Sequence, residues 1–149
     1  MSMFDAFNIN ASGLTAQRYR MDTISENVAN ANTTRTADGT PYRRKIVAFE
    51  EKGGQTSFSH VLGQAAYAHG YTGKGVKVRG VYEDHETEMI MAYDPSHPDA
   101  DENGYVTYPN VNIITEMTNL IDASRAYEAN ATAFNASKSM AQQGLQMNS

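Results

Sequence analysis

The sequence predicts an α+β fold in which long N- and C-terminal helices pair in a coiled-coil-like manner, with a small β-rich insert between them. Apolar residues recur at heptad spacing near both ends of the 149-residue chain. The segment between the two stripes is rich in Gly and polar residues, and it contains short runs typical of strands.

The expected organisation follows these changes of pattern. Residues 1–34 should form the N-terminal helix and an Asn- and Thr-rich corner, and residues 35–110 the β-rich insert with a flexible Gly-rich loop. Residues 111–149 should form the C-terminal helix. The length fits one domain, in which the terminal helices form a single unit.

An apolar stripe predicts the first helix. Its spacing places side chains along one side of a helix. The members expected to pack against the second helix are Leu14, Met21, Ile24 and Val28. The residues that follow tolerate the left-handed conformation or hydrogen-bond their own backbone, so the helix should end near Asn32.

The strands of the insert are expected to be short because Gly and Pro separate them. The candidates are residues 42–49, 75–82, 89–93 and 105–108. A turn at Asn103-Gly104 should precede the last of them. Residues 53–75 show no periodicity and are expected to be a mobile loop before assembly. The basic run 43–45 is expected to be a solvated strand end.

A longer apolar stripe predicts the second helix and the matching half of the interface. Its members are Ile113, Met117, Leu120, Ile121, Tyr127 and Phe134. The stripe weakens after Phe134, where Ser137 and Lys138 enter. The other faces carry mainly Ala, Asn, Ser, Thr and Gln, which suits contact with neighbouring protein. The alternative is that they are solvated surfaces of an isolated helix pair.

Composition limits the function classes. Charges are mixed along the chain and sum to -5, which argues against nucleic acid and anionic membranes as partners. The chain has no Cys, so disulfides and thiolate zinc sites are excluded. We see no Sec-type signal peptide and no bilayer-spanning stretch, which alone predicts a cytoplasmic protein. Two helices without a deep core should leave an isolated subunit loosely ordered until it assembles.

Two local motifs resemble catalytic sites but differ from them in spacing or in an essential residue. Residues 70–75 lack the glycine spacing and the Ser or Thr of a phosphate loop. Residues 85–89 begin like a zinc-protease helix, yet Met89 replaces the second His, so we expect an acidic turn. An enzyme is the least favoured alternative, because the four His lie in unlike contexts. We therefore expect no catalytic residue, cofactor or small-molecule substrate.

A third motif resembles half of a calcium loop. Residues 99–107 supply oxygen ligands at positions one, three and five, and a Gly at six. Position twelve is Asn110 rather than the bidentate Glu, and two prolines oppose the helix that should lead into the loop. We expect a turn here and no bound metal. A calcium-binding extracellular module remains as an alternative.

Several segments together resemble the bacterial flagellar basal-body rod proteins, most closely those of the proximal rod. They include residues 30–33, 93–100, 104–106, 109–112 and 116–130. The residues that carry the resemblance are Asn30, Asn32, Thr33, Pro95, His97, Pro98, Pro109, Asn110, Glu116, Arg125, Tyr127 and Asn130. It covers nearly the whole chain, and residues 53–75 match least.

The resemblance implies a non-enzymatic structural subunit that polymerises through its terminal helices into the axial tube, which transmits torque across the periplasm. The implied partners are other copies of the chain, neighbouring rod and basal-body proteins, and the flagellar type III export apparatus. That route requires no cleaved signal peptide and no direct membrane insertion. Another axial subunit, of the distal rod or the hook, is the nearest alternative.

The resemblance also suggests roles for single residues. Asn30, Asn32 and Thr33 should form a structural corner that turns the chain out of the helices into the insert. Asn130 and Asn135 are expected to be interhelical hydrogen-bonding residues once they are buried, because an unpaired buried amide is costly.

Overall fold

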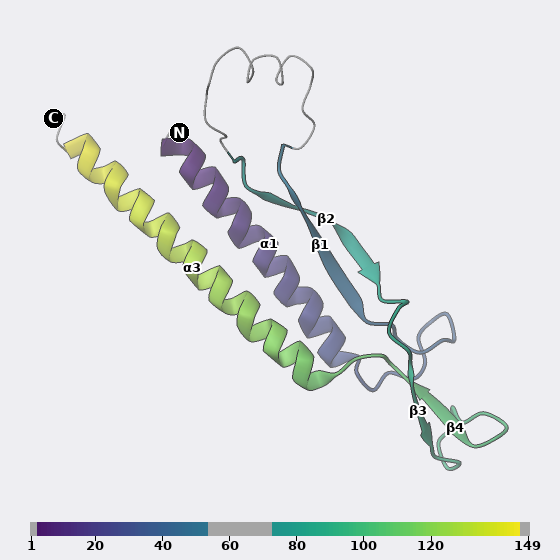
Figure 1. Ribbon diagram of the computed structural model, residues 1–149. Coiled ribbons are helices and arrows are strands. Elements are labelled where there is room, and N and C mark those ends of the chain that lie inside the picture. The colour runs from purple at the N-terminus through teal and green to yellow at the C-terminus, as the bar shows by residue number, and fades with distance from the viewer. Residues whose placement is uncertain (1–2, 54–72, 147–149) are drawn as a thin grey trace.

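The structure, a computed structural model that describes residues 3–53 and 73–146, confirms the predicted α+β fold (Figure 1). The elements in chain order are α1 (Met3–Ala29), β1 (Lys45–Glu51), β2 (Val76–Glu83), β3 (Ile90–Tyr93), β4 (Tyr105–Tyr108) and α3 (Ile113–Gln146). The two helices run antiparallel and side by side, so both chain ends lie at the same end of the pair (Figure 1).

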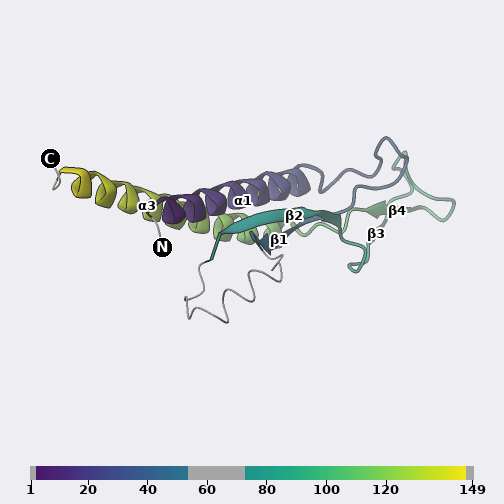
Figure 2. The same cartoon turned by 90° about the horizontal axis from the view of Figure 1, so that it is seen from above.

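The helices pack closely along most of α1. At one end of the contact, the rings of Phe7 and Phe134 meet edge to face with centroids 5.1 Å apart. Farther along, Ile24 and Ala123 are buried. With 34 residues against 27, α3 is about 10 Å longer than α1 at 1.5 Å per residue, and its last turns extend past the start of α1 (Figures 1 and 2).

The first helix ends at Ala29, three residues before the predicted end. The side-chain amide of Asn30 donates to the carbonyl of Glu26 (2.9 Å), and the Thr33 hydroxyl donates to Asn30 Oδ1 (3.1 Å). The Glu26 carbonyl also accepts from the backbone N–H of Asn30 (3.1 Å), so these side-chain bonds add to the last backbone bond of the helix and link it to the corner. No non-glycine residue in the described ranges has a positive φ, so side-chain hydrogen bonds, rather than left-handed residues, form the predicted corner.

The insert contains two separate two-stranded antiparallel sheets, β1 with β2 and β3 with β4. All four strands lie at the predicted places, with boundaries shifted by up to three residues. The first strand begins late, at Lys45, because the backbone N–H of Arg44 donates to the Asn110 side chain (2.9 Å). The Gly-rich segment predicted to be a loop lies almost entirely outside the described residues.

The two hairpins occupy different positions relative to the helices. The β1–β2 hairpin lies along α1 and makes its helix contacts there (Figures 1 and 2). The β3–β4 hairpin projects beyond the end of the helix pair opposite the chain termini (Figures 1 and 2). The molecule is therefore elongated.

Candidate assembly interface

The structure distributes the predicted interface residues over two environments. Ile24 is buried. Those that are half-buried are Leu14, Met21, Val28, Leu120, Tyr127 and Phe134. By contrast, Ile113, Met117 and Ile121 are 43%, 55% and 52% exposed. The reason is that Glu116, and not Met117, takes the buried position on the first turns of α3. Whether these residues contact another subunit remains a prediction.

The exposed residues define a surface that we call the α3 stripe, formed by Ile113, Ile114, Met117 and Ile121. Steps of three and four residues place them on one side of the first turns of α3. Ile114 is 78% exposed, more than any other large apolar side chain in the described part of the chain. Two further apolar side chains, Met140 and Leu145, are exposed near the far end of α3. The helix thus carries apolar side chains that its own subunit leaves uncovered.

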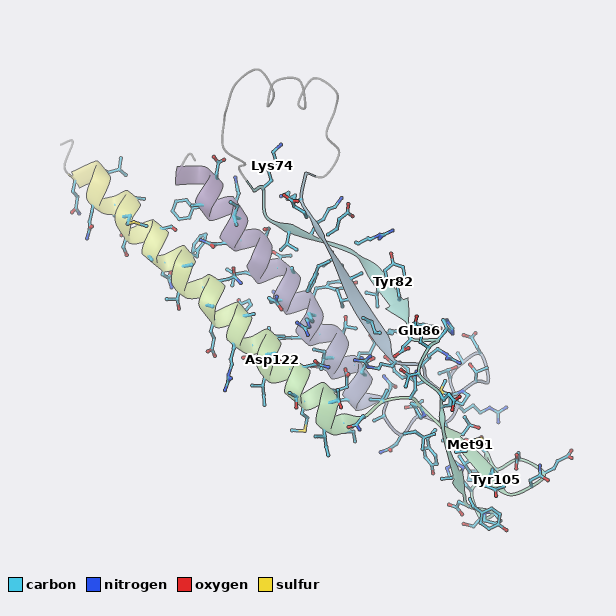
Figure 3. The ribbon with its side chains drawn as sticks, in the orientation of Figure 1. Lys74, Tyr82, Glu86, Met91, Tyr105 and Asp122 are labelled. Atoms are coloured by element: carbon cyan, nitrogen blue, oxygen red, sulfur yellow. The ribbon has the colours of Figure 1, made fainter. Side chains whose placement is uncertain are left out.

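A second exposed apolar surface lies on the projecting hairpin. The strand register pairs Tyr93 with Tyr105, whose rings pack edge to face with centroids 5.3 Å apart. Met91 shares their face because it lies two residues from Tyr93, and all three side chains are exposed. Figure 3 shows Met91 and Tyr105 on this hairpin, away from the helices. The opposite face carries Val106, which is fully buried.

A buried polar cluster joins the insert to the helices; we call it the polar junction, and it consists of Asn27, Arg44, Asp84, Asn110 and Glu116. The side chains of Asn27 and Glu116 are 0% and 1% exposed. Glu116 Oε1 accepts hydrogen bonds from Arg44 Nε (2.9 Å) and Nη2 (2.8 Å), and its Oε2 accepts one from Asn27 Nδ2 (3.0 Å). The buried carboxylate is therefore both paired with a cation and hydrogen-bonded.

Asn27 uses its whole hydrogen-bonding capacity in the polar junction. Its Oδ1 accepts from the Tyr42 hydroxyl and from the backbone N–H of Lys45, both at 2.9 Å. Its Nδ2 donates to the Lys45 carbonyl (2.8 Å) as well as to Glu116. The end of α1 thus holds both backbone polar groups of the first residue of β1.

The side chain of Asn110 likewise bonds backbone groups, on the other side of the insert. Its Oδ1 accepts from the Arg44 backbone, and its Nδ2 donates to the carbonyls of Asp84 (2.9 Å) and Thr87 (3.1 Å). Two buried amides therefore fix the backbone at the base of both hairpins.

The polar junction perturbs two titrating groups. Burial, assisted by the charges of Glu26, Glu116 and Glu83, raises the pKa of Tyr42 to about 12. The backbone and hydroxyl of Thr87 hold the pKa of Asp84 below its usual value, and the Arg44 side chain adds to this effect. Both shifts favour the states that the hydrogen bonds require, a neutral phenol and an ionised carboxylate.

The prediction of a solvated strand end at residues 43–45 is wrong for Arg44. Its guanidinium bridges the buried Glu116 and, at 3.4 Å, the buried Asp84. Sequence reasoning also missed Asn27 and Asp84 as members of the cluster. One signal was available, because Glu116 is the only charged residue between Glu102 and Asp122.

The residues that carry the family resemblance fall in four places, of which the first is the corner after α1, with Asn30, Asn32 and Thr33. Pro95, His97 and Pro98 lie between β3 and β4, and Pro109 and Asn110 are buried just before α3. On α3, Arg125 is exposed and Asn130 is half-buried. The amide of Asn130 donates to the Ala126 carbonyl of its own helix (2.7 Å), so a hydrogen bond from it to another helix stays a prediction. Asn135, given the same expected role, is exposed.

The predicted turn after Asp101 is confirmed. Asp101 Oδ1 accepts from the backbone N–H groups of Asn103 (2.9 Å) and Tyr105 (2.8 Å), and Gly104 has φ +81°. Asp99 accepts from the Thr34 hydroxyl (2.8 Å). Within residues 3–53 and 73–146, no group of three or more His, Asp or Glu side chains is arranged to hold a metal ion.

The two stretches that resemble catalytic motifs are residues 85–89, which the structure describes in full, and residues 70–75, which it describes from residue 73. The acidic stretch after β2 is a turn, in which Asp84 Oδ1 accepts from the backbone of Glu86 (3.1 Å) and Thr87 (3.0 Å). The start of the segment 70–75 lies outside the described residues.

Of the helices described, neither combines the length and apolar character needed to cross a bilayer.

Comparison with known proteins identifies the family. Residues 7–35 match the family described as "Flagella basal body rod protein", and residues 102–147 match "Flagellar basal body rod FlgEFG protein C-terminal". The chain is 44% identical over 151 residues to flagellar basal-body rod protein FlgC of Bacillus subtilis, covering 99% of each chain. It is 43% identical to the Borreliella burgdorferi protein of that name, covering 97% of each chain. With FlgC of Salmonella typhimurium it shares 39% identity over 94% of this chain and 93% of the relative. The chain therefore belongs to the FlgC family of flagellar basal-body rod proteins, which is structural and non-enzymatic.

Proposed function

We propose that this protein is a proximal rod subunit that polymerises through its terminal helices into the axial tube of the basal body. Its partners are other copies of the chain and neighbouring rod and basal-body proteins. The tube transmits torque across the periplasm, and many close helix contacts give it the stiffness that this task requires. Contacts between unlike surfaces of successive subunits, which do not close into a ring, generate the helical polymer.

The observation that carries this proposal is the α3 stripe. Apolar side chains gathered on one exposed side of a helix mark a surface for contact with another protein. The stripe begins one residue beyond the buried Pro109–Val111 segment, which anchors the start of α3 in the fold. The remaining outer face of α3 has few charges, which suits close packing against neighbours.

Delivery by the flagellar type III export apparatus, without a cleaved signal peptide, is part of the proposal. The support is the combination of rod-family membership with the exposed apolar side chains of α3. A subunit of this kind can travel incompletely folded and complete its packing on arrival.

A charge placed on the α3 stripe tests the proposal. In Met117→Asp, the new carboxylate lies on a side chain that is 55% exposed in the subunit, so the fold should persist while rod incorporation is lost. Leu120→Asp places the charge on the half-buried face against α1 and should loosen the helix pair as well. Ala37→Asp, in an exposed turn of the insert, is the matched control and should leave motility normal.

The measurements are far-UV circular dichroism of the purified variants, swimming in soft agar, and electron microscopy of isolated basal bodies. Intact basal bodies and normal swimming with Met117→Asp would exclude the stripe as an assembly surface. The match of residues 102–147 to a FlgEFG family keeps a distal rod or hook position as the second candidate. Complementation of strains that lack FlgC, or instead a distal rod or hook subunit, separates the two positions.

A further inference from the structure

We propose that the polar junction is a conformational latch that holds the insert to the helix pair. When the ion pair between Arg44 and Glu116 is broken, the insert detaches while α1 and α3 stay packed. The latch acts within a single subunit, so it goes beyond the proposed assembly function and can fail without affecting it.

The polar junction lies where the chain passes between the helices and both hairpins. Arg44 directly precedes β1, Asp84 directly follows β2, and Asn110 follows β4 after one intervening residue. Asn27 belongs to the last turn of α1, and Glu116 to the first turn of α3. One cluster therefore ties the entry and exit points of the insert to the two helices.

Besides the packing of β1 and β2 along α1, the other polar connections between insert and helices are weaker. The backbone N–H of Val76 donates to Ser12 Oγ on α1 (3.1 Å), and Lys45 pairs with Glu26. The Lys45–Glu26 pair is 32% and 46% exposed, and such surface pairs contribute little because water screens them. The buried apolar cluster at this end of the molecule is small and consists of Ala31, Tyr42 and Val111.

The helix pair has its own contacts that do not depend on the polar junction. Phe7 packs on Phe134, and the buried Ala123 lies between these rings and Glu116 along α3. Removal of the Arg44 guanidinium leaves an uncompensated charge on Glu116, which is strongly destabilising at a buried site. Detachment of the insert lets water reach the Glu116 carboxylate without disturbing the contact between Phe7 and Phe134. Local opening should therefore be confined to the insert.

Hydrogen exchange of the full chain, measured by mass spectrometry, tests the latch. In Arg44→Met, amides of β1 and β2 should exchange about a hundredfold or more faster, the range expected for a broken buried pair, while those of α3 from Ala123 onward keep wild-type rates. Arg44→Met combined with Glu116→Leu removes both charges at similar volume and should restore most of the protection. The control is Lys77→Met, which breaks the exposed pair with Glu50 (3.5 Å) and should change nothing.

Several outcomes would overturn the latch. Equal loss of protection in helices and insert would show that the polar junction only adds to global stability. Unchanged exchange in Arg44→Met, or no recovery in the double variant, would show that the ion pair does not hold the insert. Slow amide exchange in the insert together with fast exchange in the helices of the wild-type protein would also overturn the proposal. If Arg44→Met does not fold, Arg44→Lys replaces it, since Lys keeps the charge but loses the paired contact with Oε1. It should give a smaller loss confined to the insert, and uniform loss would again refute the proposal.

Discussion

The two helices approach each other closely at Gly13. Whether Gly13→Ala stabilises or destabilises the fold should therefore depend on Asn130 of α3. A Cβ atom built on Gly13 lies 2.6 Å from Asn130 Oδ1 and 2.9 Å from its Cγ. The Asn130 amide is tied to its own helix by the bond to the Ala126 carbonyl (2.7 Å). Gly13→Ala therefore forces this amide to move and weakens that bond.

Two effects of Gly13→Ala oppose each other. Replacing Gly by Ala inside a helix gains about 1 kcal/mol. Overpacking costs about 1 to 3 kcal/mol, and weakening the hydrogen bond of Asn130 costs about 1 kcal/mol more. We expect a net loss of about 1 to 3 kcal/mol in the free energy of unfolding. In an Asn130→Ala background the obstruction is gone, so the same change should stabilise the fold by about 1 kcal/mol.

The two positions form a double-mutant cycle. Urea unfolding followed by far-UV circular dichroism measures the free energy of unfolding of the wild type, of each single variant and of the double variant. The expected coupling energy between the two sites is about 2 to 4 kcal/mol. Gly144→Ala is the matched control, because no heavy atom lies within 4 Å of its added Cβ and it should not couple to position 130. A stabilising Gly13→Ala in the wild-type background, or a coupling below about 0.5 kcal/mol, would refute the close helix contact.

Three further predictions concern other parts of the subunit. Gln17→Leu should raise the free energy of unfolding by about 1 kcal/mol in thermal melts, because it removes a buried side-chain oxygen that has no hydrogen-bond partner; a lower melting temperature would contradict this. The pKa of Tyr42 is about 12 in the fold against 10.0 in an exposed tyrosine, so its contribution to stability is complete below pH 10 and is lost as the pH rises through 12. Ultraviolet titration should show one late phenol that Tyr42→Phe removes, and its persistence would count against the assignment. Removal of residues 139–149 should block rod assembly but leave export largely intact, since it takes away the exposed end of α3; truncated protein retained in the cytoplasm would speak against this.

The elements of this fold could be predicted because each leaves a local signal. Both helices follow apolar periodicity, and a Gly or Pro residue lies close to at least one end of each strand. Element ends were less predictable because individual side-chain hydrogen bonds decide them, and apolar periodicity does not reveal such bonds. The start of β1 depends on Asn110, and the end of α1 on a bond between the Asn30 side chain and the Glu26 carbonyl.

The polar junction could not be predicted because its partners are far apart in the sequence. Arg44 and Glu116 are separated by 72 residues, and no local pattern pairs them. The heptad stripe on α3 was misleading at its start for the same reason. Glu116 is buried by its partners in the insert, which turns Met117 outward although Met is the apolar residue. A buried ion pair overrides hydrophobic periodicity when its partner comes from another element.

The elongated shape has a consequence for growth. One end of the subunit presents both chain termini and the last turns of α3, and the other presents the aromatic face of the β3–β4 hairpin (Figure 1). A column of such subunits, stacked end to end in one orientation, has two chemically unlike tips. New subunits arriving at one tip meet a surface that the other tip lacks. If the proposed polymer stacks its subunits in this way, the difference between its two tips favours extension from one of them.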